Sequence, residues 1–373
     1  MKCVNCGKDS NYKERSGKQC PHCKKAFAFE PKGGDKVTDM LFQNAIAAVS
    51  GEGRIRWGVE HLYYEVCRRK RGKAAPLGCI AIALVVFVFC AAMMINGLRV
   101  NPAKPPFFFI GSLLSGVVLL GLVATLFRSK FVAMEREEFN RYWTRWTNVM
   151  GKPSGLIERV PEPKLPADLE ADIGDYSFDR AVICDRARTV DLLVANNFHF
   201  ENNCAVLSFD GYPKGVFGTI RTMLKKNPKL QVFVLHDATI GGCNLAQRLI
   251  TDPHWFGGSG LRVIDLGLRP QHAGPFKGLL LRADGPMLTD EPGITAGEAQ
   301  WLSRHTLELA AVRPEQVLKR LFAGLMAHAN DDPRTGDSSG AGAVTTCGAF
   351  DAGGYGGDGA DGLGGEGGAD AFG

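Results

Sequence analysis

The run Gln231-Val-Phe-Val-Leu-His-Asp-Ala-Thr-Ile-Gly-Gly-Cys-Asn-Leu-Ala246 contains the unit on which the second half of the chain is built. Its first part, Gln231–Leu235, holds β-branched and aromatic apolar residues and predicts a buried strand. A polar turn follows, and a helix is predicted over Cys243–Ile250. A strand joined by a short turn to a helix is the repeating unit of a parallel sheet covered by helices.

The same alternation continues on both sides of this run, between residues 175 and 330. Further strands are predicted at Ala181–Cys184, Cys204–Phe209 and Leu261–Leu266, and further helices at Ala187–Asn196, Val216–Lys226, Gly297–Leu309 and Pro314–Ala327. The predicted fold of 175–330 is therefore an α/β domain with a mostly parallel sheet, Rossmann-like in outline.

Two acidic residues stand where such a sheet binds its ligands, beyond the carboxyl ends of its strands. Asp185 follows one predicted strand, and Asp237 follows another. They are the candidate catalytic residues. Each also precedes a predicted helix, so each could instead cap that helix. His236 could be a general base or a metal ligand, and a hydrogen-bonded structural histidine is the simpler interpretation.

The residues after Gln231–Leu235 resemble the second signature of Toprim domains, in which Asp-x-Asp-x-x-Gly precedes a helix. Asp237 and Gly242 match that signature, and Thr239 stands at its second aspartate. Asp185 is the nearest match to the glutamate of the first signature. The resemblance covers about residues 182–266 and implies Mg²⁺ held by clustered carboxylates. Because Thr239 is a poor ligand, a degenerate, non-catalytic Toprim-like domain is favoured over an active one.

Two CxxC pairs lie at the N-terminus, Cys3-Val-Asn-Cys6 and Cys20-Pro-His-Cys23, separated by 13 residues. Each pair can aim two thiolates at one point, and two pairs complete a tetrahedron around a structural Zn²⁺. The metal ligands are thus predicted to be Cys3, Cys6, Cys20 and Cys23, in a zinc ribbon over residues 1–30 that resembles those of many bacterial membrane proteins. His22 is expected to face solvent.

Two apolar runs without charge, Leu77–Asn96 and Phe107–Phe127, predict transmembrane helices within residues 76–97 and 106–127. Each is long enough to cross a hydrocarbon core of about 30 Å. The connection is short and rich in proline, so they would form a hairpin in the lipid bilayer. Gly116 and other small residues of the second run could pack inside the hairpin or support oligomerisation.

The charges that flank the hairpin predict its orientation. A basic cluster, 68–73, precedes the first run, and Arg128 and Lys130 follow the second, whereas the turn holds only Arg99 and Lys104. By the positive-inside rule both termini would be cytoplasmic, in the inner (plasma) membrane, as a multi-pass protein. Scattered, unpaired cysteines also fit a reducing compartment.

The remaining segments complete the predicted organisation. Juxtamembrane helices are predicted over 31–75, and a cytoplasmic helix with a proline-rich linker over 128–174. Phe131–Val149, in this helix, could lie on the bilayer surface or pack against the α/β domain. The glycine-rich tail, 331–373, carries a net charge of −7 and is predicted to be disordered. Because the whole chain carries +5, the rest carries +12, which could serve nucleic acid or anionic lipid.

Two functions of different classes follow from these features. The first is a membrane-anchored zinc-ribbon adaptor or sensor, whose cytoplasmic α/β domain binds a protein or nucleic acid without catalysis. The second is a Mg²⁺-dependent Toprim-like enzyme acting on nucleic acid or a nucleotide. The sequence leans toward the first, because no complete catalytic set is present. If Asp185 and Asp237 converge on one point, the enzyme is favoured.

Overall fold

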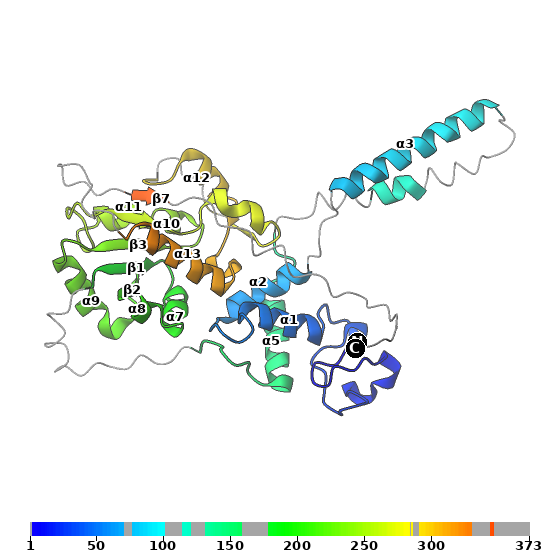
Figure 1. The fold of residues 1–373 in the computed structure, drawn as a ribbon, viewed down its shortest axis with the longest axis horizontal. Helices are drawn as coiled ribbons and strands as arrows, with labels where there is room; N and C mark the ends of the chain where they lie inside the picture. The colour runs from blue at the N-terminus through cyan, green and yellow to red at the C-terminus, as the bar shows by residue number, and fades with distance from the viewer. Residues whose placement is uncertain are drawn as a thin grey trace, which may run out of the picture.

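The computed structural model describes residues 2–70, 77–100, 114–120, 131–158, 178–283, 285, 291–329 and 344–346. Figure 1 shows three parts: an α/β layer structure, a set of short helices with the N-terminal cysteine module beside it, and a helix, α3, that stands away from both.

The α/β part is built on a parallel five-stranded sheet with the order β2-β1-β3-β4-β7. Its strands are β1 (Arg180–Cys184), β2 (Cys204–Ser208), β3 (Gln231–Leu235), β4 (Val263–Asp265) and β7 (Val344–Thr346). The chain runs outward from β1 to β2 and then returns to β3 on the other side of β1. The order therefore reverses between β1 and β3, which is where doubly wound sheets bind ligands.

Helices cover both faces of this sheet (Figure 1). They are α7 (Ala187–Ala195), α8 (Phe198–Glu201), α9 (Lys214–Lys226), α10 (Ile240–Cys243), α11 (Leu245–Thr251), α12 (Ala296–Leu302) and α13 (Pro314–Ala327). Successive strand residues point to opposite faces, so each strand supplies two cores. Val182 and Phe233 belong to one core, and Ile183 and Val232 belong to the other.

The predicted strands and most predicted helices are present within a few residues of their expected bounds. The helix expected over Cys243–Ile250 is divided, because Asn244 ends α10 and begins α11. The helix expected over Gly297–Leu309 ends at Leu302. A strand β6 (His305–Thr306), antiparallel to β5 (Leu281–Arg282), and a 3-10 turn η6 (Leu309–Ala311) replace its last part.

The disorder predicted for the tail is wrong at one place. Val344–Thr346 forms β7, which pairs in parallel with β4 at the edge of the sheet. Its β-branched residues suit a strand, and Arg262 Nε donates a 2.8 Å hydrogen bond to Thr345 Oγ1. The rest of the predicted disordered tail lies outside the described residues.

The short helices α1 (Asp39–Val49), α2 (Val59–Lys70) and α5 (Arg136–Met150) form what we call the helical bundle. Phe139, Tyr142 and Trp146 of α5 are buried. Phe29, before α1, stacks on Trp146 with 6.0 Å between ring centroids. The apolar face of α5 is thus a packing face, as one alternative predicted, but its aromatic partners are N-terminal residues rather than the sheet.

The N-terminal module contains three 3-10 turns, η1 (Tyr12–Glu14), η2 (Ser16–Lys18) and η3 (Pro31–Gly33). In the α/β part, a longer 3-10 segment, η5 (Pro270–Phe276), follows β4. Asp39 joins the module to the bundle, because its carboxylate accepts hydrogen bonds from the backbone N–H groups of Ala28 (3.1 Å) and Phe29 (2.8 Å).

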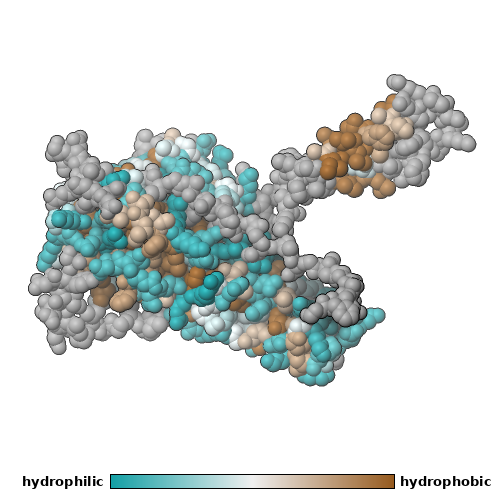
Figure 2. Space-filling view, viewed as in Figure 1, coloured by the Kyte–Doolittle hydropathy of each residue, from teal (hydrophilic) through white to brown (hydrophobic). Residues whose placement is uncertain are grey.

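The helix α3 comprises Leu77–Val100, with side chains described at 81–93 and 95. Ile82, Val85 and Phe89 are 66%, 68% and 62% exposed, and Figure 2 shows the apolar surface that α3 presents. In the described part of the chain, no helix combines the length and apolar character needed to cross a membrane. The spans predicted within 76–97 and 106–127 are therefore not confirmed, and most of the second lies outside the described residues.

Gly116 was one of the small residues for which two roles were open. A Cβ atom added to it would lie 3.0 Å from the ring of Phe87 in α3. Residue 116 therefore packs against α3 within the same chain, as the interpretation of packing inside the hairpin predicts.

Candidate functional site

The four N-terminal cysteines come together as predicted. Their sulfur atoms all lie within 4.8 Å of one another and could hold a metal ion. Cys3 Sγ lies 3.8 Å from Cys23 Sγ, and Cys6 Sγ lies 3.7 Å from Cys20 Sγ. A tetrahedron of sulfurs at the Zn–S distance of 2.3 Å has edges of about 3.8 Å, so the spacing fits zinc.

The backbone around each CxxC pair explains this convergence. Gly7 N–H donates to the carbonyl of Cys3, and Lys24 N–H donates to the carbonyl of Cys20, both at 2.9 Å. Gly7 and Lys24 adopt positive φ angles of 71° and 60°, which turn the chain back over the sulfurs. His22 is exposed and is not among the clustered ligands, as expected.

The thiols of the cluster differ in acidity. A backbone hydrogen bond from Lys8 lowers the pKa of Cys6, but burial and the neighbouring cysteine sulfurs outweigh it and raise that pKa to about 11, whereas the pKa of Cys20 is lowered. The backbone N–H of Cys23 is the largest of the influences that lower the pKa of Cys20, to about 6. Because metals bind the thiolate and not the thiol, a lowered pKa favours metal binding at neutral pH.

Asp185 and Asp237 lie side by side at the point where the strand order reverses. Asp185 follows β1, Asp237 follows β3, and the Asp237 N–H donates a 2.9 Å hydrogen bond to Asp185 Oδ2. Neither side chain caps a helix, so that alternative is wrong. Arg186 is the N-cap residue of α7, without a side-chain cap bond, and Thr239 caps α10 by accepting from Gly242 N–H.

Both carboxylate oxygens of Asp237 already have partners. Oδ1 accepts a 2.6 Å hydrogen bond from the backbone N–H of Leu309. Oδ2 lies 3.2 Å from Arg186 Nε and 3.5 Å from Arg188 Nη2. A cation bound at Asp237 would have to displace guanidinium groups and would be repelled by them.

Asp185 differs from its neighbour because one of its oxygens has no partner. Oδ1 is buried and makes no hydrogen bond among the described residues. Burial, followed by the negative charge of Asp237, raises the pKa of Asp185 to about 7. Two adjacent acids that would otherwise repel each other can thus share the site, because Asp185 is partly protonated near neutral pH and increasingly protonated as the pH falls.

A chain of polar contacts extends from Asp237 to the helical bundle. Arg188 Nη2 also lies 3.2 Å from Glu308 Oε1. Glu308 Oε2 pairs with Arg136 of α5 and accepts a 3.0 Å hydrogen bond from Tyr64 Oη of α2. Burial alone would raise the pKa of Glu308, but Arg188 and Arg136 hold it below its ordinary value. Glu308 is therefore a charged link between the bundle and the sheet.

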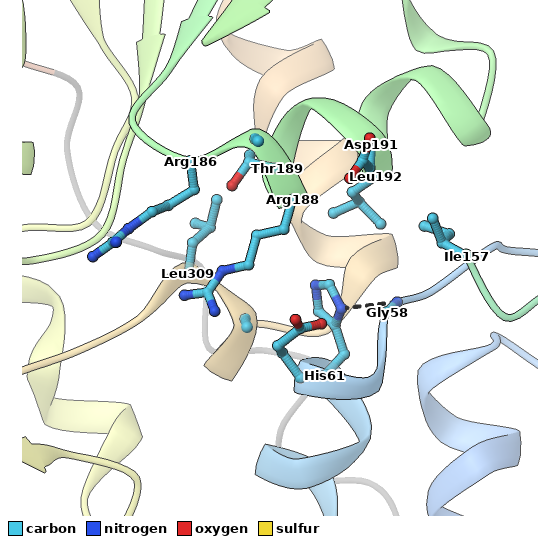
Figure 3. Close-up of a pocket in the computed structure, with 12 residues that line it drawn as sticks. Gly58, His61, Ile157, Arg186, Arg188, Thr189, Asp191, Leu192 and Leu309 are labelled. Carbon is cyan, nitrogen blue, oxygen red and sulfur yellow. Dashed lines mark hydrogen bonds between the residues drawn. The ribbon is translucent and has the colours of Figure 1, made fainter. Parts of the chain in front are cut away.

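A cavity of about 380 Å³ lies beside this chain of contacts, between α2 and α7. Figure 3 shows Arg188 extending from the start of α7 beside His61 of α2, with Gly58 on the other side of the imidazole ring. Its walls come from both the bundle and the α/β part: Gly58, Glu60, His61, Ile157, Arg186, Ala187, Arg188, Thr189, Asp191, Leu192, Leu309 and Ala310.

His61 is held as a neutral hydrogen-bond donor on the cavity wall. Its Nδ1 accepts a 3.3 Å hydrogen bond from Gly58 N–H, which leaves the proton of the neutral ring on Nε2. Burial is the largest cause that lowers its pKa, to about 4. The side chain is therefore uncharged at neutral pH.

His236 has a structural environment rather than a catalytic one. It is fully buried, and its ring nitrogens lie 2.8 Å from the carbonyl oxygen of Asp237 and 2.9 Å from Asp265 Oδ1. Both partners are acceptors, so both ring nitrogens carry protons. Burial opposes that charge, but Asp265 raises the pKa of His236 above its ordinary value. Arg269 completes the cluster, 2.8 Å from Asp265.

Sequence reasoning identified the two aspartates but not the groups around them. Arg186 and Arg188 directly follow Asp185, and this alternation of charges could have indicated that the acids are paired with cations. Glu308, Arg136 and His61 come from distant segments, and no local pattern marks them. In the described part of the chain, the cysteines form the one group of three or more metal-ligating side chains.

Comparisons with known proteins add nothing to the resemblance noted above. No protein family, no curated protein and no solved structure matches the chain. The likeness to Toprim domains therefore depends on the short sequence motifs alone.

Proposed function

We propose that the protein is a non-catalytic sensor or adaptor, anchored to a membrane, in which the cavity between α2 and α7 receives a ligand. The observation that carries the proposal is the position of this cavity. One wall belongs to α2 of the bundle and the opposite wall to α7 and η6 of the α/β part. A ligand that contacts both walls would favour one packing of the bundle on the sheet, which is how binding is transmitted.

The interface between these two parts supports transmission in both directions. α2 packs on η6. Glu65 of α2 is buried and lies 3.2 Å from Arg313, which precedes α13. Arg68 of α2 donates a 2.6 Å hydrogen bond to the carbonyl of Ala311. These contacts are directional and charged, so a small change in the packing angle would break them. The two parts are therefore expected to move together.

The proposed membrane anchor is supported by the exposed apolar side chains of α3 and by the sequence around this helix. The bundle helix α2 ends at Lys70, shortly before α3 begins at Leu77. The apolar side chains exposed along α3 are unfavourable in water. Transfer of the helix into a lipid bilayer would remove this cost. In this proposal, both ends of the chain lie on the cytoplasmic face of the inner membrane, where a protein or nucleic acid would be the partner.

The cysteine cluster is proposed to hold structural Zn²⁺. The module contains few buried side chains of its own, so the metal would supply much of its folding free energy. Its surface carries several lysines and would present them to a partner near the membrane.

The alternative, a Mg²⁺-dependent enzyme, is less well supported by the arrangement of charges. Mg²⁺ prefers several oxygen ligands in an octahedron, and it usually keeps some water. Here Asp237 is engaged by Arg186, by Arg188 and by a backbone N–H. Two features favour the enzyme: Asp185 lies beside Asp237, as the enzyme hypothesis expects, and its Oδ1 has no partner among the described residues.

The experiment is a thermal unfolding measurement of the full-length chain in detergent, with and without millimolar Mg²⁺, beside Asp237→Asn. The sensor proposal expects Mg²⁺ to leave the unfolding temperature of the wild type unchanged. If Mg²⁺ stabilises the wild type in a saturable manner and Asp237→Asn abolishes this effect, the sensor proposal is rejected in favour of the enzyme. Membrane attachment is tested separately, by flotation with lipid vesicles of a chain in which 77–127 is replaced by a glycine–serine linker.

A further inference from the structure

We infer that the ligand of the cavity between α2 and α7 is a phosphate ester of a small hydroxylated molecule, of the sugar phosphate class. The inference builds on the proposed binding function and adds the chemistry of the ligand. It follows from three features of the cavity wall: cationic donors on one side, neutral polar and acidic groups on another, and aliphatic residues between them.

The cationic side is formed by the start of α7. Arg186 and Arg188 both line the cavity, and the first turn of α7 has no side-chain cap among the described residues. The uncapped N–H groups of a helix start and two guanidinium groups are the donors that a phosphate oxygen accepts best.

The acids beside these arginines position them without using all of their donors. Arg186 contacts Asp237 through Nε, and half of its side chain remains exposed. A guanidinium group has five N–H donors, so the terminal nitrogens of Arg186 can still bind a phosphate. Arg188 is fixed from both sides by Asp237 and Glu308. The pairs therefore preorganise the site, which lowers the entropy that binding would cost.

A second, independent feature points to a ligand. The imidazole of His61 is more than nine-tenths buried and lines the cavity, and its Nδ1 is occupied by Gly58 N–H. Within the described residues, no protein group accepts a hydrogen bond from Nε2–H. The Nε2 atom is not among the fully buried atoms that lack a partner, so an oxygen atom of a ligand in the cavity could reach it and accept its hydrogen bond.

The acidic groups of the wall suit hydroxyl groups of the ligand. Glu60 and Asp191 line the cavity, and Asp191 Oδ1 already accepts a 2.5 Å hydrogen bond from Tyr212 Oη. Carboxylates accept several hydrogen bonds each, and sugar hydroxyls are suitable donors. They would repel a second phosphate, so the site fits one phosphate group at one end of a hydroxylated body.

The size and the apolar part of the wall argue against a larger ligand with a flat ring. The volume, about 380 Å³, is near the lower end for small-molecule sites. Ile157, Leu192 and Leu309 are aliphatic, and the wall contains no phenylalanine, tyrosine or tryptophan on which a nucleobase could stack.

The experiment measures binding of ribose 5-phosphate, inorganic phosphate and ribose to the full-length chain in detergent by isothermal titration calorimetry. We expect ribose 5-phosphate to bind about fivefold or more tightly than phosphate, because hydroxyl contacts add to the phosphate contacts. We expect no measurable binding of ribose. Arg186→Gln should weaken binding of ribose 5-phosphate about tenfold or more, because it removes charge-assisted hydrogen bonds.

Two further variants separate the site from the rest of the chain. Ala187→Leu places a larger side chain on the cavity wall and should abolish binding without removing any charge. Arg304→Gln changes an exposed arginine that does not line the cavity, and should leave the affinity unchanged. The unfolding temperature of each variant shows whether it is folded.

The inference is overturned if ribose 5-phosphate does not bind, if phosphate binds equally well, or if Arg186→Gln binds as tightly as the wild type. Binding of ribose that survives Arg186→Gln and is lost in Ala187→Leu would reject the phosphate ester and retain the ligand site of the proposed function. The Mg²⁺ experiment above tests that function by a different signal, so the two failures are distinguishable.

Discussion

Replacing Glu308 by glutamine should loosen the contact between the helical bundle and the α/β part. The carboxylate of Glu308 pairs with Arg136, lies 3.2 Å from Arg188 and accepts a 3.0 Å hydrogen bond from Tyr64. Glutamine has nearly the same shape, so the substitution removes the charge and leaves little cavity. It also presents an amide N–H₂ group toward side chains that are donors themselves.

The magnitude can be worked from the burial of the partners. Removing one partner of a fully buried ion pair costs about 3–5 kcal/mol. The side chains of Arg136 and Arg188 are 38% and 31% exposed, so water screens part of the charge that is left. Arg188 also keeps Asp237 as a partner. We therefore expect the free energy of unfolding to fall by about 2 kcal/mol.

Hydrogen exchange of the full-length chain, followed by mass spectrometry, is the appropriate assay because it reads each part separately. Exchange should accelerate in α2, α5 and α7 and remain unchanged in the cysteine module. The control is Glu158→Gln, which breaks an exposed pair with Lys152 and should change stability by less than about 0.5 kcal/mol. If Glu308→Gln behaves like this control, the charged link between bundle and sheet is not a stabilising one.

The pH dependence of the same variant tests whether it is the charged form of Glu308 that stabilises the fold. The pKa of Glu308 is lower in the folded protein than its ordinary value of 4.5. Its contribution is therefore present above about pH 4.5 and is lost as the pH falls through the folded pKa. The difference in stability between the wild type and Glu308→Gln should be constant near neutral pH and should shrink in acid.

Three other outcomes follow from particular contacts. Gly267→Ala should lower the free energy of unfolding by about 3 kcal/mol, and with it the unfolding temperature, because the new Cβ would lie 2.3 Å from the ring of His236. The control Gly218→Ala lies in open space on α9 and should raise the unfolding temperature slightly. Cys20→Ser should reduce the zinc content measured by atomic absorption and increase proteolysis of the N-terminal module. Burial raises the pKa of Asp185 from 3.8 to about 7, so its contribution to stability is complete below about pH 4 and is lost as the pH rises to about 7. Asp185→Asn should therefore flatten the fall in unfolding temperature between about pH 4 and 7.

Local patterns predicted the parts of this fold that are themselves local. The strands β1 and β3 are short apolar runs bounded by polar turns, and α13 begins at the proline that marks its first turn. The cysteine module was predictable because the spacing within each CxxC pair determines the turn, and the observed sulfur distances agree with it. In each case one contiguous segment contains the necessary information.

The candidate site could be predicted only in part, because its members come from segments that are distant in the chain. The sequence placed Asp185 and Asp237 at the carboxyl ends of two strands but left open whether they converge, because their proximity depends on β1 and β3 being adjacent in the sheet. That Asp237 is paired with arginines depends on how the start of α7 faces it. The participation of His61 and Glu308 depends on the docking of the bundle, which no periodicity encodes. The strand β7 was missed because three β-branched residues within a glycine-rich tail are too short a signal.

The charges at the point where the strand order reverses explain why a site that resembles a metal centre in sequence is proposed to bind an anion. Two adjacent acids at the end of a parallel sheet would attract a cation if they faced water alone. Here Arg186 and Arg188 occupy the outer side of Asp237, and Glu308 holds Arg188 in place from the far side. The acids then act as supports that orient the guanidinium groups of two residues that line the cavity. Since the same Glu308 also binds Arg136 and Tyr64 of the bundle, a phosphate bound to Arg188 would act on the contact with the bundle through a single shared side chain. Ligand recognition and coupling between the two parts are thus carried by the same side chains, which is why Arg188→Gln should impair both, whereas Arg186→Gln should impair recognition alone.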